Sequence, residues 1–340
     1  MATIREISEY TNLSPSTVSI VLSGKAKSRN ISEGTTKKVL EAAKELGYTP
    51  NISARRLRNN NAKKYVAVFW ANDYRAPLLF EFINGIQKYI EATKDDFEIV
   101  LRLFKPDYLS KAADPEQLTM YSATVICTAS TIDLDYLEKT DFSTPIVLYN
   151  RYSQKYSNVL LINEDIGAKA AEIFISHGKK RAVIFATQNN KSNYYEKRMS
   201  GFINSFNSSG GITTIINSTD NSLRSAHNTI ADMETAFANA DCVFCLQDLL
   251  AISYINYLRD KKIVDVPSSQ EIISIGVHDN NTYESLHIPL SVIEIPIEQM
   301  GTECMRIVTD KLKGNYHQIE SKVMDFNFMP RSSCSDIPKD

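Results

Sequence analysis

The segment 14–22 carries the first group of side chains that could act on a ligand. It begins with Ser14, a natural N-cap, and Pro15, which suits the first helical position because the N–H that proline lacks has no partner there. Three aliphatic residues then recur at helical spacing and define a buried face. The other side chains are short enough to approach the major groove of DNA, and they are Ser16, Thr17, Ser19 and Ile20. The segment is therefore predicted to be a short helix that reads DNA.

Basic side chains form a second group at 51–58, directly after Pro50. Asn51 can cap a helix of fewer than three turns, and a helix this short is unstable in free solution. Its arginines surround a single aliphatic residue, Leu57. A minor-groove intercalator uses these residue types, because arginines neutralise phosphates while the aliphatic group separates a base step. The alternative interpretation is a basic linker between domains.

Two further predicted helices flank the segment 14–22 and must position it. The first has Ile4, Ile7 and Tyr10 at the spacing of one helical face, and a turn at 12–13 joins it to the second. Two short helices joined in this way form a helix-turn-helix, whose second helix enters the major groove. A third helix follows, and its predicted inner face comprises Val39, Leu40, Ala43 and Leu46.

Charge divides the sequence at about residue 64. Residues 1–64 hold twelve Lys/Arg and five Asp/Glu, a balance of +7, whereas residues 65–340 hold the other 26 basic and 35 acidic residues, a balance of −9. A basic N-terminal region on an acidic body is typical of a region that meets a polyanion.

Beyond residue 64, apolar runs alternate with amphipathic segments. The run 65–70 is apolar throughout, as in a strand that is buried on both faces of a parallel sheet. The alternation predicts an α/β fold of two doubly wound halves, in which ligands bind outside the carboxyl ends of the strands. No apolar run approaches the ~20 residues that span a bilayer. The N-terminus lacks the pattern of a secretory signal, which favours a cytoplasmic location.

The N-terminal region resembles the LacI/GalR family of bacterial transcriptional regulators. The resemblance is carried by Thr3–Ser8, Leu13–Ser19, Val39–Tyr48 and Pro50–Leu57. It implies a recognition helix at about 15–22 and a hinge helix at about 51–58, ordered only on operator DNA, where Leu57 inserts beside its dimer mate. The residues implied to contact DNA are Thr3, Ser14, Pro15, Ser16, Thr17, Ser19, Ile20, Lys25, Asn51, Ala54, Arg55, Leu57 and Arg58.

Ile20 departs from the family pattern, because many members carry an arginine there. Arginine to guanine is the commonest base contact, so that contact is lost or replaced by contact with a thymine methyl group. The loop after Gly24 is about one residue longer than usual. Its basic side chains, Lys25, Lys27 and Arg29, suit phosphates, which add affinity but not sequence choice.

The remainder of the chain resembles, more loosely, the periplasmic-binding-protein-like, sugar-binding core of the same family. The implied domains are a helix-turn-helix DNA-binding domain at 1–49, a hinge helix and linker at 50–64, and an effector-binding and dimerisation core at 65–340. The implied subdomains of the core are about 65–161 plus 294–321 and about 164–291 plus 324–340. The chain is expected to cross between them near 161–164, 290–295 and 320–325.

Side chains at the strand ends of this core are expected to line an effector pocket. Guanidinium and carboxylate groups bind vicinal hydroxyls by paired hydrogen bonds, and an aromatic face covers the apolar side of a sugar ring. His278 is an alternative to Asp279, because one extra residue precedes this position. Leu78 and Leu79 replace frequent aromatics, and the loop 71–75 could compensate. The residues implied to bind the effector are Leu78, Leu79, Asn150, Arg151, Arg198, Phe244 and Asp279.

Other motifs argue against catalysis and metal binding. Cys242 and Cys245 form a CxxC sequence, but residues three apart in a strand point to opposite faces, which favours core packing. The five histidines show no metal-ligand spacing, and the sequence lacks the GxSxG, GxGxxG and P-loop motifs. Five irregularly spaced cysteines indicate reduced thiols. We therefore expect no metal, no cofactor and no enzyme activity.

The sequence favours a DNA-binding transcriptional regulator that acts as a homodimer on a pseudo-palindromic operator. By the resemblance it is a repressor of a sugar uptake or metabolism operon, and its effector is a saccharide or sugar derivative. A co-regulator protein, as in some relatives, stays an open alternative. Two other functions compete with this one: a sugar-binding transport protein and an enzyme on the same α/β scaffold.

Overall fold

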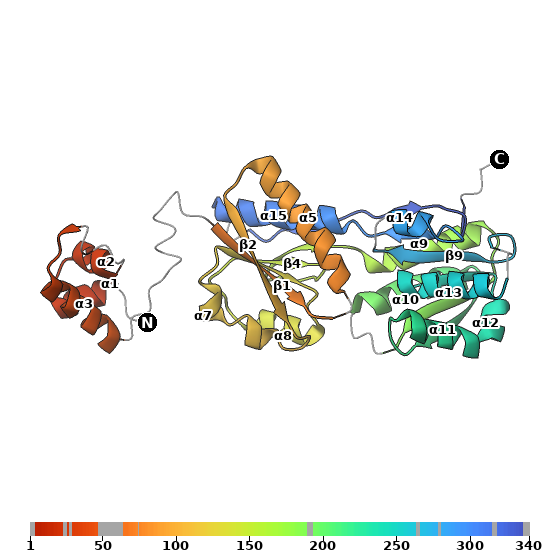
Figure 1. Cartoon of the computed structure of the whole chain (residues 1–340), viewed down its shortest axis with the longest axis horizontal. Helices are drawn as coiled ribbons and strands as arrows, with labels where there is room; N and C mark the ends of the chain where they lie inside the picture. The colour runs from red at the N-terminus through yellow and green to blue at the C-terminus, as the bar shows by residue number, and fades with distance from the viewer. Residues whose placement is uncertain are drawn as a thin grey trace. The chain divides into compact units, whose positions relative to one another are not determined.

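The computed structural model describes residues 4–22, 26, 29–46, 64–73, 75–188, 193–262, 266–277, 280–314 and 318–335. The chain divides into two compact units, Met1–Ala62 and Lys63–Asp340 (Figure 1).

The described part of the N-terminal unit contains three helices, and they are α1 (Ile4–Thr11), α2 (Pro15–Leu22) and α3 (Glu33–Glu45). The backbone N–H of Thr17 donates to Ser14 Oγ at 3.1 Å, so Ser14 caps α2 as its sequence indicated. Asn12 adopts a positive φ of 50° in the turn between α1 and α2. The small core consists of Ile7, Val18, Val21, Val39, Ala42 and Ala43.

Two side chains of this unit lie elsewhere than the helical spacing predicted. Leu40 is 51% exposed, and Ala42 takes the inner position beside Val39. Tyr10 is 59% exposed, and its hydroxyl donates to Glu45 Oε2 at 2.7 Å. A phenol can satisfy its polar end only near water or a polar partner, which explains why Tyr10 leaves the apolar face.

The described residues of the second unit form two six-stranded sheets. All neighbouring strands of the first sheet pair in parallel, in the order β11-β5-β4-β3-β1-β2. Its strands are β1 (Lys64–Ala71), β2 (Phe97–Phe104), β3 (Ala123–Cys127), β4 (Ile146–Tyr149), β5 (Ser157–Leu160) and β11 (Ser321–Val323). The helices in this half are α5 (Ala76–Thr93), α6 (Leu109–Ala112), α7 (Pro115–Leu118), α8 (Thr131–Lys139) and α15 (Ile297–Leu312).

The second sheet has the order β12-β10-β9-β8-β6-β7, and only β12 runs antiparallel to its neighbour. Its strands are β6 (Arg181–Thr187), β7 (Ile212–Ser218), β8 (Cys242–Cys245), β9 (Glu271–Gly276), β10 (Ser291–Glu294) and β12 (Asn327–Met329). The helices in this half are α9 (Asn163–Ser176), α10 (Asn193–Ser208), α11 (Leu223–Asp232), α12 (Glu234–Ala238), α13 (Asp248–Asp260) and α14 (Asn280–Glu284). Two mostly parallel sheets with covering helices confirm the predicted α/β class.

Three connections join the two sheets. They follow β5, β10 and β11, so the chain enters the second sheet through α9, returns through α15, and enters again through β12. The connection after β10 lies at 295–296, at the end of the expected crossing segment 290–295, because 291–294 are themselves a strand of the second sheet.

Two close helix crossings depend on glycines. A Cβ on Gly167 of α9 would lie 1.8 Å from the carbonyl oxygen of Arg198, and one on Gly201 of α10 would lie 2.0 Å from that of Glu164. The pair Gly85 and Gly301 plays the same part where α5 crosses α15. Since only glycine lets two helix backbones approach so closely, these residues fix the position of the helices that carry the site.

Candidate functional site

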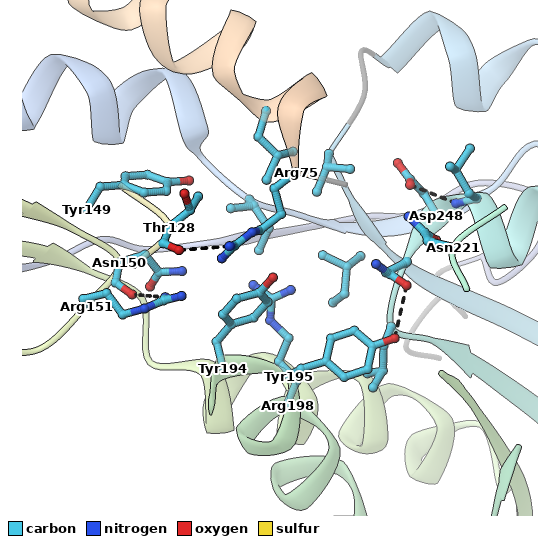
Figure 2. Close-up of a pocket in the computed structure, with 17 residues that line it drawn as sticks. Arg75, Thr128, Tyr149, Asn150, Arg151, Tyr194, Tyr195, Arg198, Asn221 and Asp248 are labelled. Atoms are coloured by element: carbon cyan, nitrogen blue, oxygen red, sulfur yellow. Dashed lines mark hydrogen bonds between the residues drawn. The ribbon is translucent and has the colours of Figure 1, made fainter. Parts of the chain in front are cut away.

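A cavity lies between the two sheets, where seventeen residues converge (Figure 2). Almost all of them follow the carboxyl end of a strand or occupy the first turns of the next helix. This is the position at which doubly wound α/β folds bind ligands. The lining residues are Arg75, Leu78, Thr128, Tyr149, Asn150, Arg151, Tyr194, Tyr195, Arg198, Asn221, Leu246, Gln247, Asp248, Leu249, Ile275, Val277 and Ile295.

Arg75 reaches the cavity from the connection between β1 and α5. Its side chain is 8% exposed and pairs with Asp73, whose Oδ1 and Oδ2 each lie 3.0 Å from Arg75 Nε. Its Nη2 also donates to the carbonyl of Thr128 at 2.9 Å (Figure 2). These contacts hold the Arg75 guanidinium beside the carboxyl end of β3.

Two further guanidinium groups contact the ring of Tyr194. The guanidinium carbon of Arg151 is 5.4 Å from its ring centroid, and that of Arg198 is 5.0 Å away. Arg151 follows β4 of the first sheet, whereas Tyr194 and Arg198 belong to α10, which covers the second (Figure 2). Cation–π contact therefore joins side chains of both halves across the cavity.

Neighbouring residues orient both arginines. Arg198 Nε donates to Asn163 Oδ1 at 2.9 Å, and Asn163 begins α9. Arg151 Nη1 donates to the carbonyl of Asn150 at 2.6 Å. Asn150 has a positive φ of 50°, and its Oδ1 accepts from the backbone N–H of Leu161 at 3.3 Å. The strained turn after β4 thus directs Arg151 into the cavity.

The opposite side of the cavity offers amide and phenol groups. Tyr195 accepts a hydrogen bond from the backbone N–H of Thr187 at 3.0 Å and donates to Gln247 Oε1 at 3.3 Å. Burial raises the pKa of Tyr195 well above its ordinary value, so the phenol stays protonated. Asn221 Oδ1 is buried and finds no hydrogen-bond partner among the described residues. A buried acceptor of this kind is costly unless a ligand or water donates to it.

Asp248 also lines the cavity, and helix α13 begins with it. Its Oδ1 accepts from the backbone N–H of Leu249 at 2.9 Å, and its Oδ2 accepts from the hydroxyl of Tyr283 at 2.6 Å. The phenol of Tyr283 in turn accepts from the backbone N–H of Val277 at 2.7 Å. Asp248 therefore connects the ends of β8 and β9.

The structure brings four of the effector residues named from the sequence to this cavity: Leu78, Asn150, Arg151 and Arg198. Leu79 is partly buried and packs against the core, outside the lining. Phe244 is fully buried and stacks on Phe202, with ring centroids 5.0 Å apart. The structure does not bring Phe244 to the cavity, because this strand position faces the helices α9 and α10. Asp279 and its alternative, His278, lie outside the described residues.

Several lining residues were not singled out in the sequence. Arg75 lies in the loop 71–75, which the sequence suggests only as a compensating element. The other polar additions are Thr128, Tyr194, Tyr195, Asn221, Gln247 and Asp248. Their positions after strands or in first helical turns are compatible with a ligand site. A doubly wound fold has many such positions, however, so this pattern alone does not identify the residues that line the cavity.

The outer face of α2 carries the described part of the expected DNA-binding residues. Ser14, Pro15 and Ser16 are exposed, and three further residues are half-buried: Thr17, Ser19 and Ile20. The other expected contacts lie outside the described residues, and they are Thr3, Lys25, Asn51, Ala54, Arg55, Leu57 and Arg58.

Cys242 and Cys245 occupy opposite faces of β8, as the strand period predicted. Cys242 packs in the core between the second sheet and α9 and α10, whereas Cys245 packs in the core beneath α13. Both thiols are free and buried. Within the part of the chain that the structure describes, we find no helix long and apolar enough to cross a membrane.

Comparison with known proteins identifies the type of domain in both units. Residues 3–51 match the profile described as "Bacterial regulatory proteins, lacI family", and residues 171–334 match "Periplasmic binding protein-like domain". The chain is 27% identical to the "HTH-type transcriptional repressor PurR" of Photobacterium profundum, over 99% of this chain and 100% of that protein.

Solved structures show the same fold. A "LacI family transcription regulator from Clostridium acetobutylicum" is 26% identical, covers 79% of this chain and all of its own, and has a TM-score of 0.74. A LacI family transcriptional regulator from Enterococcus faecium "with bound ribose" is 18% identical, covers 81% of this chain and all of its own, and has a TM-score of 0.65.

A helix-turn-helix unit followed by a two-sheet α/β core with a cavity between the sheets defines a DNA-binding transcriptional regulator. The chain belongs to the LacI/GalR family of these regulators.

Proposed function

We propose that the chain represses transcription and that a small molecule bound between its two sheets controls this activity. The observation that carries the proposal is the cavity itself, because it gathers polar side chains from both sheets at their carboxyl ends. A ligand that contacts both halves stabilises one relative arrangement of them, and a ligand shifts an equilibrium only through such differential contacts.

The effector is a saccharide or a sugar derivative. Arginines and amides bind hydroxyls in pairs, while Tyr149 and Tyr194 supply aromatic surface. The ribose bound to the Enterococcus faecium regulator supports this class. The residues proposed to contact the effector are Leu78, Asn150, Arg151, Tyr194, Arg198, Asn221 and Asp279, and Leu79 supports Leu78 from the core.

Operator DNA is the second ligand, and a homodimer binds it at two half-sites. The α2 side chains Ser16 and Ile20 read bases in the major groove, while Leu57 enters the minor groove. This division corresponds to a DNA-binding domain at 1–49, a hinge helix and linker at 50–64, and a core at 65–340. Effector binding changes the arrangement of the core and thereby the spacing of the two hinge helices, a coupling between two sites.

The lacI-type unit favours a regulator in the cytoplasm over a sugar-binding transport protein. The family consists of transcriptional regulators, and we assign the chain no catalytic role.

A gel-shift titration on the DNA upstream of the chain's own gene tests the proposal. We expect a specific shift at ~150 mM salt, where phosphate contacts alone bind weakly. A Ser16→Ala, Ile20→Ala double variant serves as a matched control, because it alters only the outer face of α2. The absence of a specific shift, or equal shifts for both proteins, contradicts the proposal.

A thermal-shift screen of sugars, sugar acids and nucleosides on the full chain identifies the effector. A ligand that binds the folded protein stabilises it by mass action and so raises the melting temperature. At a ligand concentration of one hundred times Kd, the added stability is about 2.7 kcal/mol. A ligand that stabilises the wild type but not Arg198→Met binds in the cavity, whereas equal shifts for both proteins place its binding elsewhere.

A further inference from the structure

Three metal-ligating side chains meet at the end of the second sheet that lies away from the cavity. His177 ends α9, Glu271 begins β9, and Cys334 lies in the C-terminal segment after β12. The side chains of His177 and Glu271 are only 6% and 9% exposed, and Cys334 is fully buried. Nothing in the effector or DNA-binding function uses these residues.

The donor atoms form a compact triangle. His177 Nδ1 lies 2.8 Å from Glu271 Oε2, Cys334 Sγ lies 3.4 Å from the same oxygen, and Sγ and Nδ1 are 3.9 Å apart. Zinc–ligand bonds of about 2.0–2.3 Å in a tetrahedral site place two donor atoms roughly 3.3–3.6 Å apart. Each edge of the triangle is therefore within about half an ångström of that geometry.

The backbone holds these residues in place independently of the cluster. Ser291 Oγ accepts from the backbone N–H of Cys334 at 3.0 Å and donates to its carbonyl at 2.8 Å. The backbone N–H of Ile272, next to Glu271, donates to the carbonyl of Ser333 at 2.9 Å. Since the supporting segments are fixed, little ordering is needed when an ion binds.

We propose that His177, Glu271 and Cys334 bind a divalent transition-metal ion, for which Zn²⁺ is the best match. Imidazole, carboxylate and thiolate are the three ligand types that Zn²⁺ takes in proteins, and water completes the fourth position. On binding, the Cys334 thiol releases its proton to solvent and Sγ bonds to the metal. The Nδ1 proton of His177, which hydrogen-bonds Glu271 in the metal-free chain, leaves to solvent while Nε2 takes up one, so that the neutral imidazole supplies the lone pair of Nδ1. The bound ion then links the C-terminal segment around Cys334 to α9 and β9.

The charges around the cluster set its affinity for an ion. One carboxylate and one thiolate neutralise a divalent cation, and Lys179 beside Glu271 leaves one positive charge over when the ion is bound. Burial raises the pKa of the Cys334 thiol, which without metal keeps its proton and donates to Glu271. Lys179 Nζ lies 3.6 Å from Glu271 Oε1, the oxygen that faces away from the triangle. Lys179 thus opposes the metal electrostatically and sets a limit on its affinity.

The test is a Co²⁺ titration of the chelator-treated full-length protein, followed by absorbance, with bound Zn²⁺ then counted by elemental analysis. Tetrahedral Co²⁺ with a thiolate ligand shows a near-ultraviolet charge-transfer band and visible d–d bands. We expect both, with saturation at one ion per chain and displacement by Zn²⁺. No charge-transfer band, or far less than one bound Zn²⁺ per chain, overturns the proposal.

Variants separate metal binding from a purely structural hydrogen-bond cluster. Cys334→Ser keeps a donor to Glu271 but removes the thiolate, so we expect loss of the charge-transfer band and of Zn²⁺-induced thermal stabilisation. Lys179→Met removes the opposing charge and should tighten binding severalfold, which a structural role alone does not predict. Cys304→Ala, in α15 of the other half, is the control and should bind as the wild type does. Equal binding by Cys334→Ser and wild type contradicts the assignment.

Discussion

Tyr194 connects the two halves of the core at the scale of single residues. Its ring contacts Arg151, which follows a strand of the first sheet, and Arg198, which belongs to the same helix as Tyr194. Cation–π contacts contribute about 0.5–1 kcal/mol at exposed sites and about 2 kcal/mol when desolvated. Arg151 and Arg198 are 9% and 6% exposed, so both contacts are near the desolvated limit. The ring thereby orients both guanidinium groups toward the same space.

Replacing Tyr194 with alanine should weaken effector binding about tenfold or more, because two stacking contacts of about 1 kcal/mol each are lost. Operator affinity without effector should stay unchanged. Titration calorimetry with the ligand found by thermal shift measures the effect. Tyr194→Phe keeps the ring and is the matched control, so equal losses for Ala and Phe would show that the hydroxyl, not the ring, matters.

At the scale of elements, the crossing of α9 and α10 determines where the site residues lie. Gly167 and Gly201 bring the two helix backbones into direct contact. The same crossing sets the distance between Asn163, which begins α9, and Arg198 on α10, whose hydrogen bond is 2.9 Å long. A small change in helix separation therefore changes the orientation of a cavity arginine.

Gly167→Ala should lower the free energy of unfolding by about 1–3 kcal/mol, because the added methyl group overpacks the crossing and forces the helices apart. Urea denaturation followed by circular dichroism checks this. Ser200→Ala, on the exposed side of α10, is the control and should change stability by less than about 0.5 kcal/mol. A neutral Gly167→Ala would mean that the helices separate without cost.

The fold followed from the sequence where local patterns are strong. Capping at Ser14, the helix-turn-helix spacing and the alternation of apolar runs with amphipathic helices predicted both the N-terminal unit and the two-sheet core. The sequence predicted less where long-range packing determines the ends of the elements. After β7, for example, α11 ends and α12 begins at Met233, and α7 comprises only a single turn, details that no local pattern specifies.

Site residues were predictable only where a strand end or a family position selected them. Arg151 and Arg198 had such signals. Arg75 and Asn221 also follow strand ends, but they lie in loops whose course depends on tertiary contacts, so the sequence did not select them. A strand end and a family position select Phe244 as well, but its side chain enters the layer between the second sheet and the helices α9 and α10. Alternation along β8 separates its two faces, but the sequence does not tell which face meets the cavity. His177, Glu271 and Cys334 come from three distant segments, so no ligand spacing marks them.

At the scale of the whole molecule, DNA binding and core stability should be separable. Leu57→Ala should reduce operator affinity about 10–100-fold, because burying a leucine side chain contributes about 1.5–3 kcal/mol. The thermal stability of the core should not change, since the residue lies in the other unit. Fluorescence anisotropy and calorimetry measure the two quantities. Leu57→Met keeps an apolar side chain of similar volume and should bind nearly as the wild type does.

The three connections between the sheets also have a consequence for recombination between related genes. The first sheet takes β1 to β5 from the N-terminal side and β11 from near the C-terminus, and the second takes β6 to β10 and then β12. No single cut in the coding sequence separates one complete half from the other. A chimera that exchanges one half for that of a relative needs a junction at each of the three connections, so the two halves are inherited together.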